Sequence, residues 1–287
     1  MPTTLKFEFL ELVPPKGMKD PYDRVVQALR RVSKPVTVEG VPLRVETCHE
    51  AAQYIYGSAS RVDLTNLPMV ISPTTPGMKG LGIREDEGLG RPTSFLVTKR
   101  GGKILLVLHR NGNGLRIGGF LDLLQQLDGG ESFEAVPIIL TDKLQQVLKW
   151  SVYRRLEVRI ANPSNREAYD STTMKAAANL TADTDARAIS IVMSMGRARK
   201  GTLSIQAIRS AVSEFVRPKS GTVEALVISG AESEDHRADT IDLLRYRLIQ
   251  EIEVPGHLRT LEVDILEAAV QQANIKAENE LKKHFGI

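Results

Sequence analysis

Basic side chains gather in the middle of the chain, and their chemistry is that of phosphate binding. Residues 91–220 hold 20 Lys and Arg against 11 Asp and Glu, whereas residues 1–90 hold 11 of each sign. Residues 221–287 hold 7 basic against 13 acidic side chains, so the net charge of +3 conceals a basic middle and an acidic C-terminal part. A cationic surface attracts polyanions whatever fold lies beneath it.

The first cationic cluster is Arg197, Arg199 and Lys200, in the segment Gly196–Thr202 between an expected strand and an expected helix. The segment has the glycine spacing of a Walker-type phosphate loop, but the lysine that should follow the second glycine is absent. This argues against nucleotide hydrolysis, because no side chain would reach the outer phosphates. Three cations beside the free N–H groups of a helix N-terminus can still contact an anion. The alternative is a solvated turn.

A second cluster of cations lies at a helix–strand junction and consists of Lys149, Arg154, Arg155 and Arg159. Strand alternation puts Arg155 and Arg159 on one face with Glu157 between them, so an ion pair within the face is the alternative to a phosphate contact. Further candidates for phosphate contact lie at turns and strand ends: Lys99, Arg100, Arg110 and Arg116. The glycine-rich segment 112–119 resembles a dinucleotide fingerprint only weakly, and turn geometry explains it.

Residues for catalysis or metal binding do not form a recognisable motif. The five histidines lack the spacing of a zinc site, and Cys48 and His49 are adjacent, so on a strand they point to opposite faces. We therefore expect no catalytic set, metal or cofactor. Aromatic residues make up only 5% of the chain, too few for an evident base-stacking platform, so any nucleic-acid binding should involve mainly the backbone. The single cysteine is typical of a reducing compartment, and we expect a soluble cytoplasmic protein.

The elements that would position these residues alternate between strands and helices. Leu5, Phe7 and Phe9 alternate with polar residues as in a half-buried strand, whereas segments 22–32 and 205–215 have helical spacing. Further strands are expected at 93–98, 104–109, 133–140, 153–161, 189–195, 223–229 and 241–254, and further helices at 115–127, 142–150 and 165–180. The pattern predicts an α/β or α+β fold with a mixed sheet, flanking helices and a long C-terminal helix. We expect residues 68–92 to form a long surface loop.

The C-terminal helix has a regular apolar stripe at four-residue spacing, formed by Leu261, Ile265, Ala269, Ala273, Ala277 and Leu281. The central alanines allow another helix to approach closely, which would suit a homodimer seam. Packing against the chain's own sheet is the alternative. The change in charge near residue 220 suggests two domains: residues 1–220 as a core with a basic middle, and residues 221–287 as an acidic lobe that could dimerise.

Several segments, taken in order, resemble the RexA family of phage-exclusion proteins and related defence proteins. They are Gly88–Val97, Lys103–Gly114, Leu121–Leu127, Phe133–Leu140 and Leu156–Pro163. The order of the later strands and helices is also similar. The resemblance implies a cytoplasmic, dimeric DNA-binding protein that senses or limits phage, with a separately encoded membrane protein as a possible partner. It supplies no catalytic motif and no individual DNA-contacting residue.

Charge and resemblance together predict a homodimer that binds double-stranded DNA mainly without sequence preference and acts in phage defence or exclusion. Two other functions stay open. One is a nuclease or nucleotide hydrolase whose acidic residues converge only in the folded chain. The other is a protein-interaction module whose terminal helix binds a partner and which has no DNA affinity of its own.

Overall fold

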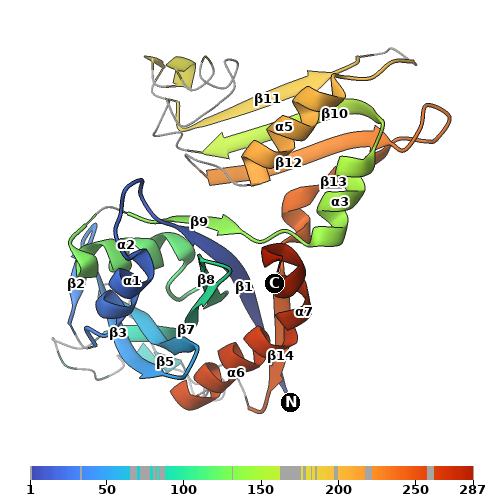
Figure 1. Ribbon diagram of the computed structural model, residues 1–287. Coiled ribbons are helices and arrows are strands. Elements are labelled where there is room, and N and C mark those ends of the chain that lie inside the picture. Colours follow the sequence, from blue (N-terminus) through green and yellow to red (C-terminus); the bar gives the residue numbers. More distant parts are fainter. Residues whose placement is uncertain are drawn as a thin grey trace. The chain divides into compact units, whose positions relative to one another are not determined.

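The structure of the chain is a computed structural model (Figure 1). It describes residues 2–286 except 33, 65–69, 72–77, 80–81, 83, 85–87, 131, 162–175, 177–178, 182, 185, 197–199, 217–221 and 257–261. The chain forms two compact units. The first takes Met1–Ala135 and Ile249–Glu278, and the second takes Val136–Leu248 and Asn279–Ile287. The change in charge near residue 220 therefore falls inside the second unit.

The first unit is built on one large sheet with the strand order β14-β1-β8-β7-β4-β3-β2, in which each pairing between neighbours is antiparallel. Its strands are β1 (Thr3–Val13), β2 (Val36–Val38), β3 (Val41–Glu50), β4 (Tyr54–Asp63), β7 (Leu89–Arg100), β8 (Lys103–His109) and β14 (Ile249–Val254). A short strand, β9 (Glu134–Pro137), also pairs with β1. A tight turn through Gly101 and Gly102, both with positive φ, joins β7 to β8 in a hairpin.

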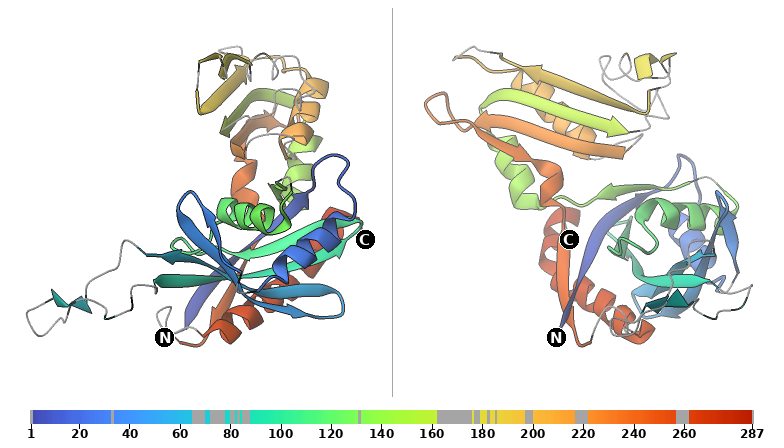
Figure 2. Two further views of the ribbon diagram at one scale, coloured as in Figure 1. Left: turned by 90° about the vertical axis from the view of Figure 1, so that its left-hand side faces the viewer. Right: turned by 180° about the vertical axis from the view of Figure 1, so that it is seen from behind.

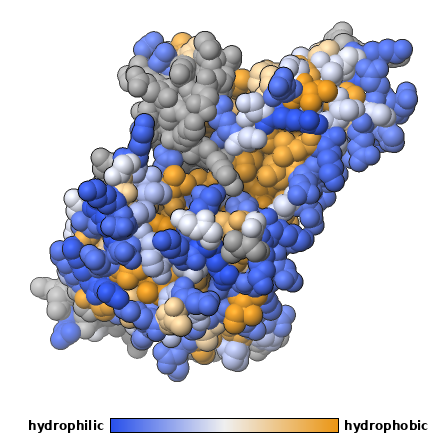
Figure 3. All heavy atoms as spheres, in the orientation of Figure 1, coloured by the Kyte–Doolittle hydropathy of each residue, from blue (hydrophilic) through white to orange (hydrophobic). Residues whose placement is uncertain are grey.

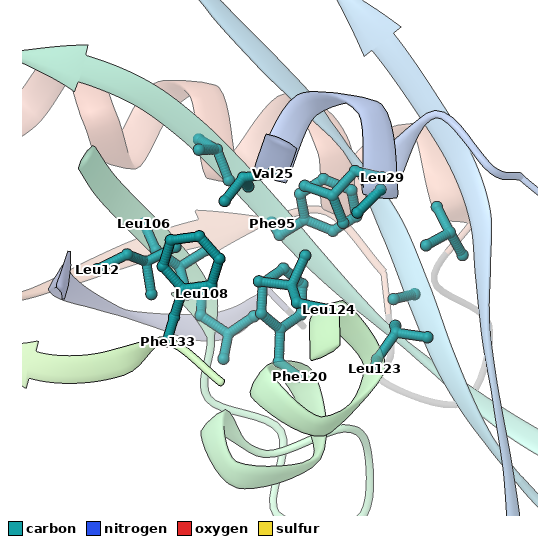
Figure 4. Close-up of a cluster of buried hydrophobic side chains, with 14 of the residues drawn as sticks. Leu12, Val25, Leu29, Phe95, Leu106, Leu108, Phe120, Leu123, Leu124 and Phe133 are labelled. Atoms are coloured by element: carbon teal, nitrogen blue, oxygen red, sulfur yellow. The ribbon is translucent and has the colours of Figure 1, made fainter. Parts of the chain in front are cut away.

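Two helices cover one face of this sheet, namely α1 (Pro21–Leu29) and α2 (Ile117–Asp128). Their apolar sides meet inward-facing strand residues in a buried core, which Figure 4 shows in close-up. Phe95 of β7 and Phe120 of α2 lie at its centre with their ring centroids 5.4 Å apart. Because side chains alternate along β7, Leu96 and Thr98 face the other side of the sheet. The sheet is therefore buried on both faces.

The helix on that other side is α6 (Val263–Lys276), which packs against β4, β7, β8 and β14 (Figures 1 and 2). After Ala277 the chain continues as α7 (Glu278–Phe285). Ala269, Ala273, Ala277 and Leu281 are buried within the chain, and Ile265 is half-buried. Leu261 lies outside the described residues. The helix thus packs on the chain's own sheet, which was the alternative to a dimer seam.

The second unit contains a four-stranded antiparallel sheet in the order β11-β10-β12-β13. The strands are β10 (Val152–Ala161), β11 (Ala188–Ser194), β12 (Thr222–Ala231) and β13 (Asp239–Asp242). One face packs against α5 (Ile205–Val216), and α3 (Thr141–Lys149) completes the same core (Figure 1). Figure 3, drawn from the same side, shows apolar side chains (orange) among hydrophilic ones (blue) on this face of the unit.

The fold is α+β, as expected, and most expected elements are present. The expected single strand at 241–254 is wrong: the 3₁₀ helix η2 (Leu243–Tyr246) separates β13 from β14, which belong to different sheets. The expected loop at 68–92 contains the short pair β5 (Val70–Ile71) and β6 (Met78–Lys79) and the start of β7, and much of it lies outside the described residues. Most of the expected helix at 165–180 also lies outside them. Among the described helices, none combines the length and apolarity needed to cross a bilayer.

Candidate anion-binding site

Most of the predicted phosphate contacts that the structure describes are engaged by local partners. Arg155 lies 2.6 Å from Glu157, and Arg159 lies 2.7 Å from Glu224, both on the face of the second sheet opposite α5. Both arginines therefore form ion pairs on this face, which was the alternative to a phosphate contact. Arg154 donates from Nη1 to the backbone oxygen of Gly201 at 2.6 Å.

Two of the predicted cations in the first unit also lie beside acidic side chains. Arg100 pairs with Glu278 at 2.9 Å, and Arg110 lies 3.9 Å from Glu8. The remaining lysines of the prediction, Lys99, Lys149 and Lys200, are exposed. Arg197 and Arg199 lie outside the described residues. The predicted cations are thus divided between the two units, and the acids beside them neutralise several of their charges.

Arg116 is the predicted cation that the structure places in a pocket. The pocket has a volume of about 570 Å³ and is lined by Arg61, Asp63, Leu89, Arg91, Gly112, Asn113 and Arg116. Three arginines and one aspartate give this lining a formal charge of +2. Arg61 and Arg91 were not among the predicted contacts. Nothing in the sequence marks them as neighbours, because 30 positions separate them and only the pairing of β4 with β7 brings them together.

The strand register explains how the arginines meet. Arg61 of β4 is directly opposite Arg91 of β7, so their side chains project from the same face of the sheet. The same face carries the core residues Phe95 of β7 and Ala59 of β4, and the two arginines lie on it just beyond the edge of that core. Like charges directly opposite each other destabilise a strand pair. Within the described part of the chain, neither side chain forms an ion pair or hydrogen bond that would offset this repulsion.

The third arginine is held by a tightly packed loop. Leu115 donates its backbone N–H to Thr93 Oγ1 at 2.9 Å, and Asn111 Nδ2 donates to the backbone oxygen of Pro92. A Cβ atom on Gly114 would lie 2.5 Å from Thr93 Oγ1, so the loop approaches β7 as closely as a glycine allows. Arg116 is the N-cap residue of α2, and no side chain caps the first N–H groups of that helix. These groups add partial positive charge next to the arginine.

A second polar group, also missed from the sequence, lies between α6 and the first sheet. Glu267 of α6 is 5% exposed, and its Oε1 accepts a hydrogen bond from the hydroxyl of Thr47. The Thr47 hydroxyl in turn accepts from the backbone N–H of Ser58 at 2.9 Å. His49 Nε2 lies 3.3 Å from the other carboxylate oxygen. Both oxygens of Glu267 are thus engaged, and the group holds α6 against β3 and β4.

Cys48 and His49 lie on opposite faces of β3, as expected. Cys48 packs against the core beneath α1 and α2, and its burial raises the pKa of the thiol to about 11. Among the described residues, no group of three or more His, Cys, Asp or Glu side chains could hold a metal ion.

Comparison with known proteins gives a family but no activity. No curated protein matches the sequence. A family model described as a family of unknown function, DUF6731, matches residues 62–261, which include Arg91, Arg116 and most of the second unit. Because this match spans more than half of the 287 residues, the chain belongs to the DUF6731 family.

Proposed function

We propose that the protein binds the phosphate backbone of double-stranded DNA, mainly without sequence preference, and acts as a homodimer in phage defence or exclusion. The observation that carries the DNA-binding proposal is the pocket of Arg61, Arg91 and Arg116. Two of these arginines face each other across a strand pair without an acidic partner among the described residues. A phosphate between them would replace mutual repulsion by two charge-assisted hydrogen-bonding contacts.

The charge distribution supports the same ligand class. The pocket's strand β7 opens the basic stretch 91–220. An arginine pocket recognises phosphate oxygens rather than base edges, so the affinity should depend strongly on salt and weakly on sequence. The role in phage defence is supported by the resemblance to the RexA family, and it would take place in the cytoplasm, with a membrane protein as a possible further partner.

The test is fluorescence anisotropy with a random-sequence duplex across a salt series. Each phosphate that a cation neutralises contributes about 0.9 to the slope of log K against log salt concentration. The triple variant R61Q/R91Q/R116Q should therefore lower the magnitude of the slope by about 2.7. Glutamine keeps much of the length of the side chain and removes the charge.

A matched control removes the same formal charge from arginines that already have acidic partners. In R30Q/R155Q/R159Q, each changed residue is an exposed member of an ion pair, with Glu50, Glu157 and Glu224 respectively. The slope of this control should stay close to that of the wild type. An equal fall in both variants would show that net charge, not the pocket, governs binding. No binding by the wild-type protein at physiological salt would reject the DNA proposal and favour the protein-interaction module.

A further inference from the structure

Within the part of the chain that the structure describes, the outer edge of β11 pairs with no other strand of the second unit. The backbone N–H of Met195 bonds to the carbonyl of Arg154, so odd-numbered residues of this strand direct their backbone groups toward β10. The N–H and C=O groups of Ala188, Ser190, Val192 and Ser194 therefore point away from the sheet. Among the described residues, no partner strand lies on that side.

The composition of β11 sets it apart from the other sheet edges. Its sequence, Ala188–Ser194, contains neither a charged residue nor a proline over seven residues. In contrast, β13 carries Asp239 and Asp242, β14 carries Glu251 and Glu253, and β2 has only three residues. Charges and short length are the usual devices that stop sheet edges from pairing with other chains. β11 has neither protective charges nor a short length, and its Val192 side chain is 53% exposed.

We propose that β11 pairs antiparallel with β11 of a second copy and joins the two second units through a continuous eight-stranded sheet. Charge compatibility selects a second copy on this edge. Self-pairing through β13 or β14 would bring carboxylates near their own copies, whereas self-pairing through β11 brings no formal charge into the strand pair. The proposal places the homodimer interface named above on a specific strand, and it does not depend on DNA binding.

The register follows from the direction of the backbone groups. The two-fold axis passes between Ile191 and its own copy, which form a non-hydrogen-bonded pair. Ser190 then exchanges two backbone hydrogen bonds with the copy of Val192, because both residues direct their N–H and C=O groups outward. Ile189 lies opposite the copy of Met193.

This register also matches the two faces of the sheet. Ile189, Ile191 and Met193 already pack at the margin of the second unit's core. Self-pairing places these apolar residues of both copies in one row on the face that carries α5. Serine and valine alternate on the opposite face. A slip by one residue would mix the faces. A slip by two would keep the faces but leave strand residues unpaired, and only the register centred on Ile191 pairs all residues from Ala188 to Ser194.

A single cysteine tests the register. In a C48A background, the chain has no other cysteine, because Cys48 is the only one. Ile191→Cys places the new thiol opposite its own copy in a non-hydrogen-bonded pair, where the Cα atoms are about 4.5 Å apart and a disulfide fits. Mild oxidation should give a covalent dimer on a non-reducing gel. The control Ile189→Cys should not, because its copy lies about 13 Å away along the strands.

Analytical ultracentrifugation across a concentration series, without DNA, tests the interface independently. The wild type should shift from monomer to dimer, and Val192→Pro should stay monomeric, because it removes an outward N–H without touching the ladder to β10. Thr240→Lys, on the β13 edge, should dimerise like the wild type. A wild type that stays monomeric at all concentrations, a dimer that survives Val192→Pro, or equal crosslinking at positions 189 and 191 would each overturn the proposal.

Discussion

His109 should make the protein lose stability as the pH falls, and the size of the loss can be worked from its burial. The side chain is 5% exposed, its ring lies 5.4 Å from that of Phe7, and its Nδ1 has no hydrogen-bond partner among the described residues. Burial lowers the pKa of His109 from 6.5 to about 4. The folded protein therefore keeps the ring neutral at pH values where the unfolded chain has already bound a proton.

The sign follows from the number of bound protons. Between pH 6.5 and pH 4 the unfolded state binds more protons at this position, so the free energy of unfolding falls as the pH falls. Well above pH 6.5 both states are neutral and the contribution is negligible. With these two pKa values, the loss between pH 7 and pH 5 is about 2 kcal/mol, and it approaches about 3 kcal/mol near pH 4.

Urea unfolding of the wild type and of His109→Leu, at pH 7 and at pH 5, measures this loss. Other groups also titrate in this range, but they contribute equally to both proteins, so the change in the difference isolates His109. We expect the variant to gain about 2 kcal/mol relative to the wild type on going from pH 7 to pH 5. A difference in stability that stays constant with pH would show that His109 titrates normally in the folded state, and the reasoning from burial would be refuted.

Two further predictions concern the loop and the polar group described above. Gly114→Ala should destabilise the protein by about 1–3 kcal/mol, because the added Cβ would overlap Thr93 Oγ1. Gly112→Ala should cost little, because the space around Gly112 is open. Thermal unfolding of both variants tests this prediction, and equal losses of stability would contradict it. In a double-mutant cycle followed by urea unfolding, the losses of unfolding free energy caused by Thr47→Val and Glu267→Leu should be non-additive by at least about 1 kcal/mol. The reason is that either change alone leaves a buried polar partner without its hydrogen bond. Additive losses would mean that the two side chains do not interact.

Local patterns predicted the elements well where each pattern has one clear period. The alternation of Leu5, Phe7 and Phe9 marks β1, and the apolar spacing of 205–215 marks α5. The segment 36–63 gave no such signal, although β3 and β4 lie there. In the middle of β4, Ser58, Ala59 and Ser60 are all buried, so polar and apolar residues do not alternate there. In β3, a register shift between Val45 and Thr47 interrupts the alternation.

The candidate site was less predictable than the fold, because it depends on pairing between distant residues. Arg116 was predicted as a phosphate contact from its charge beside an expected turn, but Arg61 and Arg91 become a pair only through strand register. Glu267 and Thr47 are 220 positions apart in the sequence. Conversely, the sequence alone identifies Arg155 and Arg159 as a cluster of positive charge. Whether Glu157 or a phosphate balances that charge depends on side-chain geometry, which the sequence does not give.

The discontinuity of the first unit has a consequence for how the chain folds as it leaves the ribosome. Its N-terminal part ends at Ala135, but β14, which pairs with β1, and α6, which covers one face of the sheet, arrive only after residue 248. While the intervening residues are being translated, the nascent sheet has an open edge at β1 and an uncovered apolar face around Phe7 and Leu96. Such surfaces bind chaperones or aggregate when translation stalls. Lys6, whose partner Glu251 belongs to β14, would then carry an unpaired charge on that open strand, and such a charge discourages pairing with neighbouring chains on the polysome.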